Sequence, residues 1–159
     1  MSLSFGGGGS RKEISMENED TIKLLKECDS GTKMAVASID EVLEHVSEPE
    51  LKEILEKSKN HHKELEIEIE KLLQVNKEED KQPNLMAKSM SWIKTNVKLG
   101  LDHSDSTVAD LITDGCDMGI KSLKKYLNKY QNADQKSKKH CRSLIDMEEQ
   151  LRADMGKYL

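Results

Sequence analysis

The chain has 159 residues, of which 35% are hydrophobic and 35% are charged, with only two prolines and 3% aromatic side chains. This length suits a single domain, and the composition favours long amphipathic helices over β-sheet, which is rich in β-branched and aromatic residues. The net charge of -5 argues against a protein that coats nucleic acid. The composition therefore predicts an all-α protein. We find neither an apolar run approaching the roughly 20 residues that span a bilayer nor a cleavable leader, and so expect the protein to be cytoplasmic.

The N-terminal segment, residues 1–15, differs in composition from the rest of the chain. It contains the run Gly6 to Gly9, which is flexible and has nothing to bury, so we expect this segment to be disordered. The codons AGA-AAG-GAG-ATT, encoding Arg11 to Ile14, would form a bacterial ribosome-binding site at the usual distance from a start codon at Met16. We hypothesise that residues 1–15 are a disordered tail or a non-native leader and that the folded domain spans residues 16–159.

The first half of the domain predicts a helical hairpin. The first helix is expected over residues 17–46, with its apolar side chains on one face and Asp29 and Thr32 at the polar centre of that face. The segment 47–50 is a tight connection, because serine is a good N-cap and proline is tolerated in a first helical turn. The second helix follows at once and runs antiparallel to the first. Its inward face passes through Leu51, Leu55, Ser58, His62, Leu65, Ile69 and Leu72.

The second half predicts a connecting helix and another hairpin. A polar loop over residues 76–82 precedes a helical pattern over residues 85–101 that contains Trp92, the single tryptophan. We interpret this segment as a short crossover helix. The third helix is expected over residues 106–130 and the fourth over residues 134–158, each with an apolar inward face.

Several short segments carry a resemblance to a known family. They are Leu24-Leu25, Asp29-Ser30-Gly31, Pro49-Glu50-Leu51-Lys52, Lys63-Glu64-Leu65 and Trp92. Over about residues 21–159 the chain resembles a group of bacterial ferritin-like domains of unknown function. The resemblance implies an all-α, ferritin-like four-helix bundle with a crossover helix between helices two and three, which is the connectivity expected from the two hairpins. None of these segments is a catalytic signature.

Di-iron members of the ferritin-like superfamily need a glutamate from each of two helices and a Glu-x-x-His pair from each of the other two. Helix one offers Asp29, which is a shorter carboxylate. Helix two offers His61 or His62, which cannot both face inward, and the residues three positions earlier are Ser58 and Lys59. Neither Glu-x-x-His pair therefore exists in helix two.

Helices three and four also lack most of the ligands that a di-iron site needs. In helix three the resemblance places the ligand near Cys116, and in helix four the corresponding pair would be Ile145 and Glu148. We therefore do not expect a di-iron oxidase. The cysteines, among them Cys116, are widely spaced without a C-x-x-C pair, which is typical of free thiols.

Three interpretations of the polar inward residues stay open. In the first, Asp29, His62 and Glu148 form a degenerate site for one divalent metal such as iron, zinc or manganese, because imidazole and carboxylates suit these ions. In the second, these residues are buried and satisfy one another, for example through a hydrogen bond from His62 to Asp29 or Glu148. In the third, the helical register differs and they lie at the surface.

The basic residues between positions 121 and 142 suggest a further surface feature. They are Lys121, Lys124, Lys125, Lys129, Lys136, Lys138, Lys139 and Arg142, against Asp134 as the single acid. Such lysines are either solvated helix ends or a docking patch for an acidic partner.

The incomplete ligand set and the apolar segment 85–101 together predict a non-catalytic bundle without a cofactor. We expect it to act by self-association as a homo-oligomer or by binding another protein, and to bind neither nucleic acid nor membrane. The alternative is a metal-binding protein related to di-iron oxidoreductases.

Overall fold

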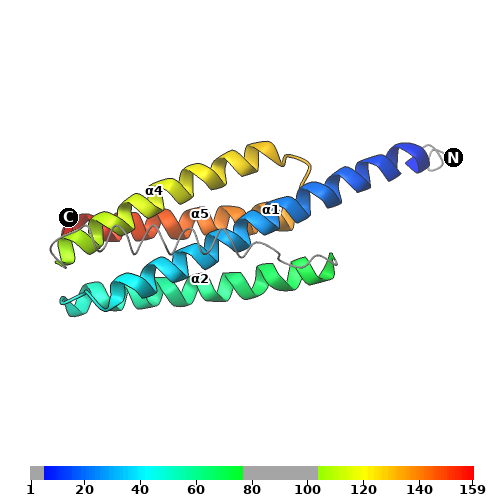
Figure 1. The fold of residues 1–159 in the computed structure, drawn as a ribbon. Coiled ribbons are helices and arrows are strands. Elements are labelled where there is room, and N and C mark those ends of the chain that lie inside the picture. Colours follow the sequence, from blue (N-terminus) through cyan, green and yellow to red (C-terminus); the bar gives the residue numbers. More distant parts are fainter. Residues whose placement is uncertain (1–5, 77–103) are drawn as a thin grey trace.

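The computed structural model describes residues 6–76 and 104–159, with side chains from residue 16 onward. This part of the chain contains α-helices and no strand (Figure 1). The helices are α1 (Gly6–Leu43), α2 (Pro49–Val75), α4 (Asp105–Lys129) and α5 (Gln135–Met155), followed by the short 3-10 helix η2 (Gly156–Tyr158). The predicted all-α class is confirmed.

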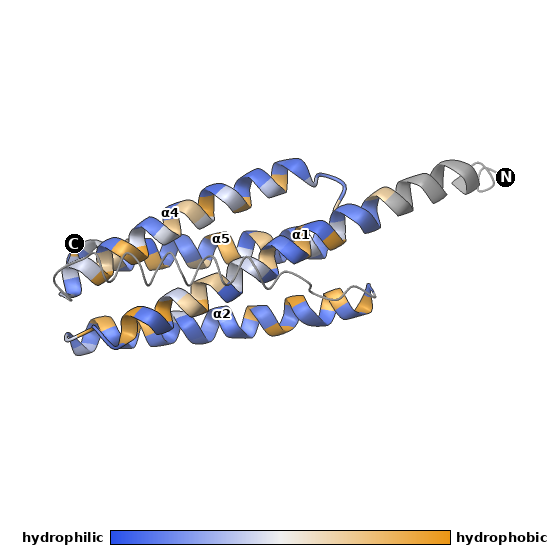
Figure 2. Ribbon diagram, in the orientation of Figure 1, coloured by the Kyte–Doolittle hydropathy of each residue, from blue (hydrophilic) through white to orange (hydrophobic). Residues whose placement is uncertain are grey.

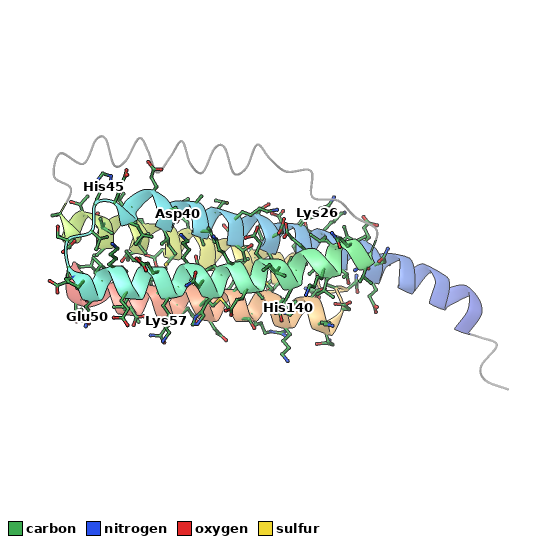
Figure 3. The ribbon with its side chains drawn as sticks, turned by 90° about the horizontal axis from the view of Figure 1, so that it is seen from below. Lys26, Asp40, His45, Glu50, Lys57 and His140 are labelled. Atoms are coloured by element: carbon green, nitrogen blue, oxygen red, sulfur yellow. The ribbon has the colours of Figure 1, made fainter. Side chains whose placement is uncertain are left out.

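The four α-helices pack as two antiparallel hairpins, α1 with α2 and α4 with α5 (Figure 1). Helix α5 also packs against α2, and α1 against both α4 and α5. Hydrophobic positions follow stripes along the helices (Figure 2), and leucine and isoleucine side chains from all four form one core. Charged side chains such as Asp40 of α1 and Lys57 of α2 lie on the outside (Figure 3). The amphipathic pattern thus places the core between the helices.

One end of the bundle is held by Asp105, the first residue of α4. Its carboxylate accepts hydrogen bonds from the backbone N–H groups of Ser47 and Glu48, at 2.8 and 3.0 Å. These two residues lie directly before α2, so α4 and α2 begin at the same end of the bundle and run parallel. Ser104 caps α4, since its hydroxyl accepts from the N–H of Thr107.

The opposite end is held by α1. The hydroxyl oxygen of Thr21 accepts a hydrogen bond from the N–H of Asp134 at 2.8 Å, and Asp20 accepts one from the N–H of Asn132 at 3.0 Å. Asp134 in turn caps α5 by accepting from the N–H of Ser137. Each hairpin loop is therefore anchored to a helix of the other hairpin.

The bounds of α1 differ from the prediction. The helix ends at Leu43, and its backbone is helical from Gly6, whereas the sequence predicted disorder over residues 1–15. Extending an existing helix costs little compared with starting one, which accounts for helical structure before the packed part. Gly31 does not interrupt α1, and a Cβ placed there would lie 3.2 Å from a methyl group of Leu144 on α5. Whether the first residues are a non-native leader stays a prediction.

The crossover helix predicted over residues 85–101, with Trp92, lies outside the described residues. In the last helix, α5 ends at Met155 and the final turn tightens into η2, where one continuous helix to Tyr158 was predicted. None of the helices in the described part is long and apolar enough to cross a membrane.

Candidate functional site

A buried ion pair joins α2 to α5. His62 of α2 is fully buried, and Glu148 of α5 is 7% exposed. The Nε2 atom of His62 lies 2.8 Å from Oε2 of Glu148. Both residues were predicted as inward-facing, and the hydrogen bond between them confirms one form of the second interpretation, in which buried polar residues satisfy each other. His61, the neighbouring candidate, is exposed.

The imidazole of His62 has an oxygen acceptor on each side. Its Nδ1–H donates to the backbone carbonyl of Ser58, one turn earlier, at 2.8 Å. Because Nδ1 carries a proton, the contact between Nε2 and Glu148 requires a second proton, on one group or the other. Burial lowers the pKa of His62, but the hydrogen bond and charge of Glu148 outweigh it, so that the pKa is raised overall. We therefore describe the pair as imidazolium and carboxylate.

Helix α4 leaves room for the carboxylate of Glu148. A Cβ added to Gly119 would lie 2.8 Å from its Oε1 atom, closer than such atoms approach in proteins. Burial, and next the charge of Glu148, raise the pKa of the Cys116 thiol well above its ordinary value. A thiol with a raised pKa is a poor nucleophile, so this arrangement does not favour cysteine catalysis.

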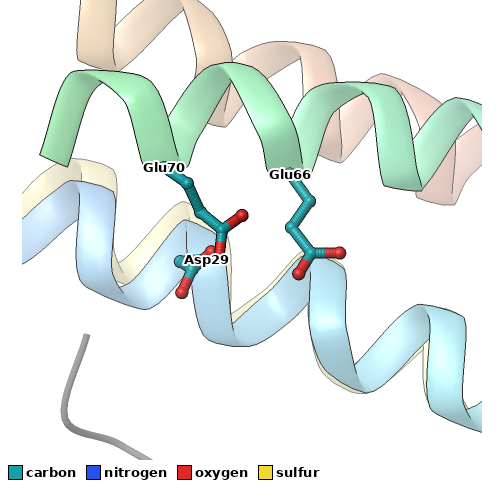
Figure 4. A group of neighbouring side chains, drawn as sticks. All are labelled: Asp29, Glu66 and Glu70. Carbon is teal, nitrogen blue, oxygen red and sulfur yellow. The ribbon is translucent and has the colours of Figure 1, made fainter. Parts of the chain in front are cut away.

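Asp29 does not join the histidine pair. It is fully buried on α1, and its carboxylate lies with those of Glu66 and Glu70 of α2, with ligand atoms within 4.8 Å of one another (Figure 4). Among the described residues, Asp29, His62 and Glu148 do not form such a group. The structure therefore brings together two of the three predicted metal ligands and places the third in a separate cluster.

Lys33 supplies a positive charge to this acidic cluster. Its ammonium nitrogen lies 2.5 Å from Oδ2 of Asp29 and 3.3 Å from Oε2 of Glu70. Sequence reasoning missed Glu66 and Glu70, because they lie beside the apolar face of α2 rather than on it. The signal that could have found them is spacing, since both pairs, Asp29 with Lys33 and Glu66 with Glu70, are one helical turn apart.

The other two cysteines meet in the core. Cys28 of α1 and Cys141 of α5 are both fully buried, and neither forms a disulfide. The hydrogen bond to Cys141, with burial, raises the pKa of Cys28 well above its ordinary value. The Sγ of Cys141 in turn lies 3.8 Å from the carbonyl oxygen of Leu123, to which it donates. The thiols are thus packed as core residues.

The described residues around His62 and Glu148 do not fit a di-iron centre. Both nitrogens of His62 are already engaged, and Lys59 stands three positions before His62, where a Glu-x-x-His pair would need a carboxylate. The carboxylates of the acidic cluster are oxygen ligands and could hold one divalent ion only in competition with Lys33.

No family model matches this chain, and neither a curated protein nor a solved structure matches it.

Proposed function

We propose that this chain is a non-catalytic, ferritin-like four-helix bundle that acts by association, first with itself and also with a protein partner. The observation that supports this proposal best is the buried pair of His62 and Glu148. His62 and Glu148 are the interior side chains best placed for chemistry. His62 binds both Glu148 and the Ser58 carbonyl, and the contact with Glu148 holds α2 against α5. Their role is therefore structural, which leaves the outer surface for function.

Apolar side chains on the outside support the association. Ile67 of α2 is 53% exposed, and Met118 of α4 is 56% exposed. Both stand among charged residues, and covering them at an interface removes apolar surface from water. Anchors of this kind, surrounded by charge, are common at the centres of protein interfaces.

Sedimentation velocity of the full chain over a wide range of concentration tests the proposal. We expect the weight-average sedimentation coefficient to rise with concentration, because association is a mass-action equilibrium. A single species with the mass of one chain at every concentration would contradict self-association.

A second function, divalent metal binding, is favoured by the convergence of Asp29, Glu66 and Glu70. Carboxylate oxygens suit Mn²⁺ among the transition metals. In this proposal the ion displaces the ammonium of Lys33, which occupies the same carboxylates. Binding would then be weak in the wild type and stronger once the competing cation is removed.

Calorimetric titration with Mn²⁺ tests this second proposal. We expect Lys33→Met to bind Mn²⁺ more tightly than the wild type and Asp29→Asn to lose binding. Glu68→Gln, on the exposed surface of α2, is the matched control and should behave as the wild type. Absence of binding in both the wild type and Lys33→Met would exclude a metal site at this cluster.

A further inference from the structure

The outer face of α4 is divided by charge along its length. Exposed acids lie in the first half of the helix and exposed lysines in the second. The acids are Asp110, Asp114 and Asp117, and the lysines are Lys121, Lys124, Lys125 and Lys129. Met118, at 56% exposure, stands at the boundary between the two halves. The charge of this face therefore changes sign near its middle.

Four of these charged residues form a single stripe with Met118. Successive members of the series Asp110, Asp114, Met118, Lys121 and Lys125 are separated by three or four positions. Such spacing places side chains above one another on one side of an α-helix. The stripe thus presents two acids, a methionine and two lysines in a line along the bundle.

The flanking charges of α4 are compensated by α5. Asp117 forms an ion pair with Arg152 at 2.8 Å, and the ammonium of Lys124 lies 3.8 Å from Glu149. These contacts bring charges of opposite sign from α5 to the edge of the stripe.

The stripe itself has no such compensation within the described part of the chain. None of its four charged members forms an ion pair with another described residue. Although Asp114 is exposed, loss of part of its hydration by the folded chain, and next the negative charges of Asp110 and Asp117, raise its pKa. The acids of the stripe therefore repel one another without a local cation, and opposite charge from outside would stabilise them.

We propose that this stripe is the surface on which a second copy of the chain docks, antiparallel to the first and related to it by a two-fold axis. The midpoint between Asp110 and Lys125 and the midpoint between Asp114 and Lys121 both fall between Asp117 and Met118. A two-fold axis through that point sets each acid opposite a lysine of the other copy. The same axis brings Met118 of both copies together, as a self-complementary interface requires.

Other occupants fit the stripe less well. A parallel second copy would set acid against acid and lysine against lysine, which opposes binding. An acidic partner would be attracted by the lysine half and repelled by the acidic half. This inference rests on the self-association proposed above and specifies its surface. Because the interface is rich in exposed charge, we expect the dimer to weaken as salt is added.

Charge-reversal variants test the proposal by sedimentation velocity. An all-acidic stripe is made by Lys121→Glu with Lys125→Glu, and an all-basic stripe by Asp110→Lys with Asp114→Lys. We expect each variant alone to dimerise about tenfold more weakly or worse, and an equimolar mixture of the two to regain association as a heterodimer. The four substitutions combined in one chain keep the net charge of the wild type and should restore the homodimer.

Control variants and wild-type behaviour separate the outcomes. Lys136→Glu with Lys139→Glu makes the same change of charge on exposed positions of α5 and should leave the dimer intact. Circular dichroism should show unchanged helix content in every variant. A wild type that stays monomeric would overturn both this surface and the proposed self-association. Undiminished dimers in both stripe variants would overturn this surface alone, and self-association would then use another face.

Discussion

The imidazole of His62 has a hydrogen-bond acceptor on each side. This arrangement determines how substitutions of His62 or Glu148 change the free energy of unfolding. Replacing Glu148 by leucine leaves a buried Nε2 without its partner. We expect Glu148→Leu to destabilise the protein by about 3–5 kcal/mol, as when one member of a buried ion pair is removed. Replacing both residues removes both buried polar groups, so that His62→Leu with Glu148→Leu should recover much of that loss. Free energies of unfolding in urea for the wild type, both single variants and the double variant measure the coupling. A Glu148→Leu variant as stable as the wild type would show that the pair contributes nothing.

The same pair predicts how stability depends on pH. The pKa of His62 is raised in the folded protein, so the stabilisation from the charged imidazole is fully present below the ordinary histidine value of about 6.5. It is lost as pH rises through the raised value, because the folded state then releases the proton it held more tightly. We expect the difference in unfolding free energy between the wild type and His62→Gln to shrink on alkalinisation above neutral pH. A difference that grows over this range would contradict the assignment of an imidazolium.

At this scale, part of the site could be predicted from sequence. His62 and Glu148 interrupt apolar faces, so helical periodicity alone marks both as inward. The position of Asp29 beside Glu66 and Glu70 could not be predicted. Periodicity shows which way a side chain points, but it does not show which residues of two packed helices lie at the same level along the bundle axis. That level is shown by contacts such as the 2.6 Å ion pair between Lys59 and Asp40, which sets Asp29 opposite Glu70, well along α2 from His62.

At the scale of elements, Asp105 connects α4 to the start of α2. Replacing it with alanine removes the acceptor for the N–H groups of Ser47 and Glu48. We expect Asp105→Ala to cost about 1 kcal/mol, as loss of a helix cap typically does. Amide hydrogen exchange should accelerate in the first turn of α2, although the substitution lies in α4. The exposed Ser106→Ala is a suitable control, and unchanged exchange at the start of α2 would show that this contact does not stabilise it.

The helices themselves were predictable because their signals are local. Apolar periodicity placed the second hairpin within a few residues of its observed bounds, and the structure shows that Ser104 and Asp134 cap its two helices. The hydrogen bonds that join the hairpins connect residues far apart in sequence, such as Asp105 with Ser47 and Thr21 with Asp134. No local pattern identifies these partners, so the contacts that orient the hairpins became apparent only in three dimensions.

At the scale of the molecule, the sequence predicted an all-helical bundle and left open a docking patch among the basic residues 121–142, but it did not show which of these charges are paired. The charges of α4 resemble those of any solvated helix until the positions of α5 are known. Arg152 and Glu149 of α5 then separate the charges that are compensated from those on the stripe. The buried polar groups therefore stabilise the packing of the helices, whereas the proposed association uses the charged stripe on the outer face of α4.

The central claim is that the buried polar groups are structural and that the protein acts by self-association. Native mass spectrometry of the full chain, purified without chelator and sprayed at low ionic strength, tests this claim most directly. It reports the number of chains in the assembly and any bound metal at the same time. We predict a species with the mass of two chains and no retained transition metal. A species with the mass of one chain that retains a stoichiometric transition metal would contradict it.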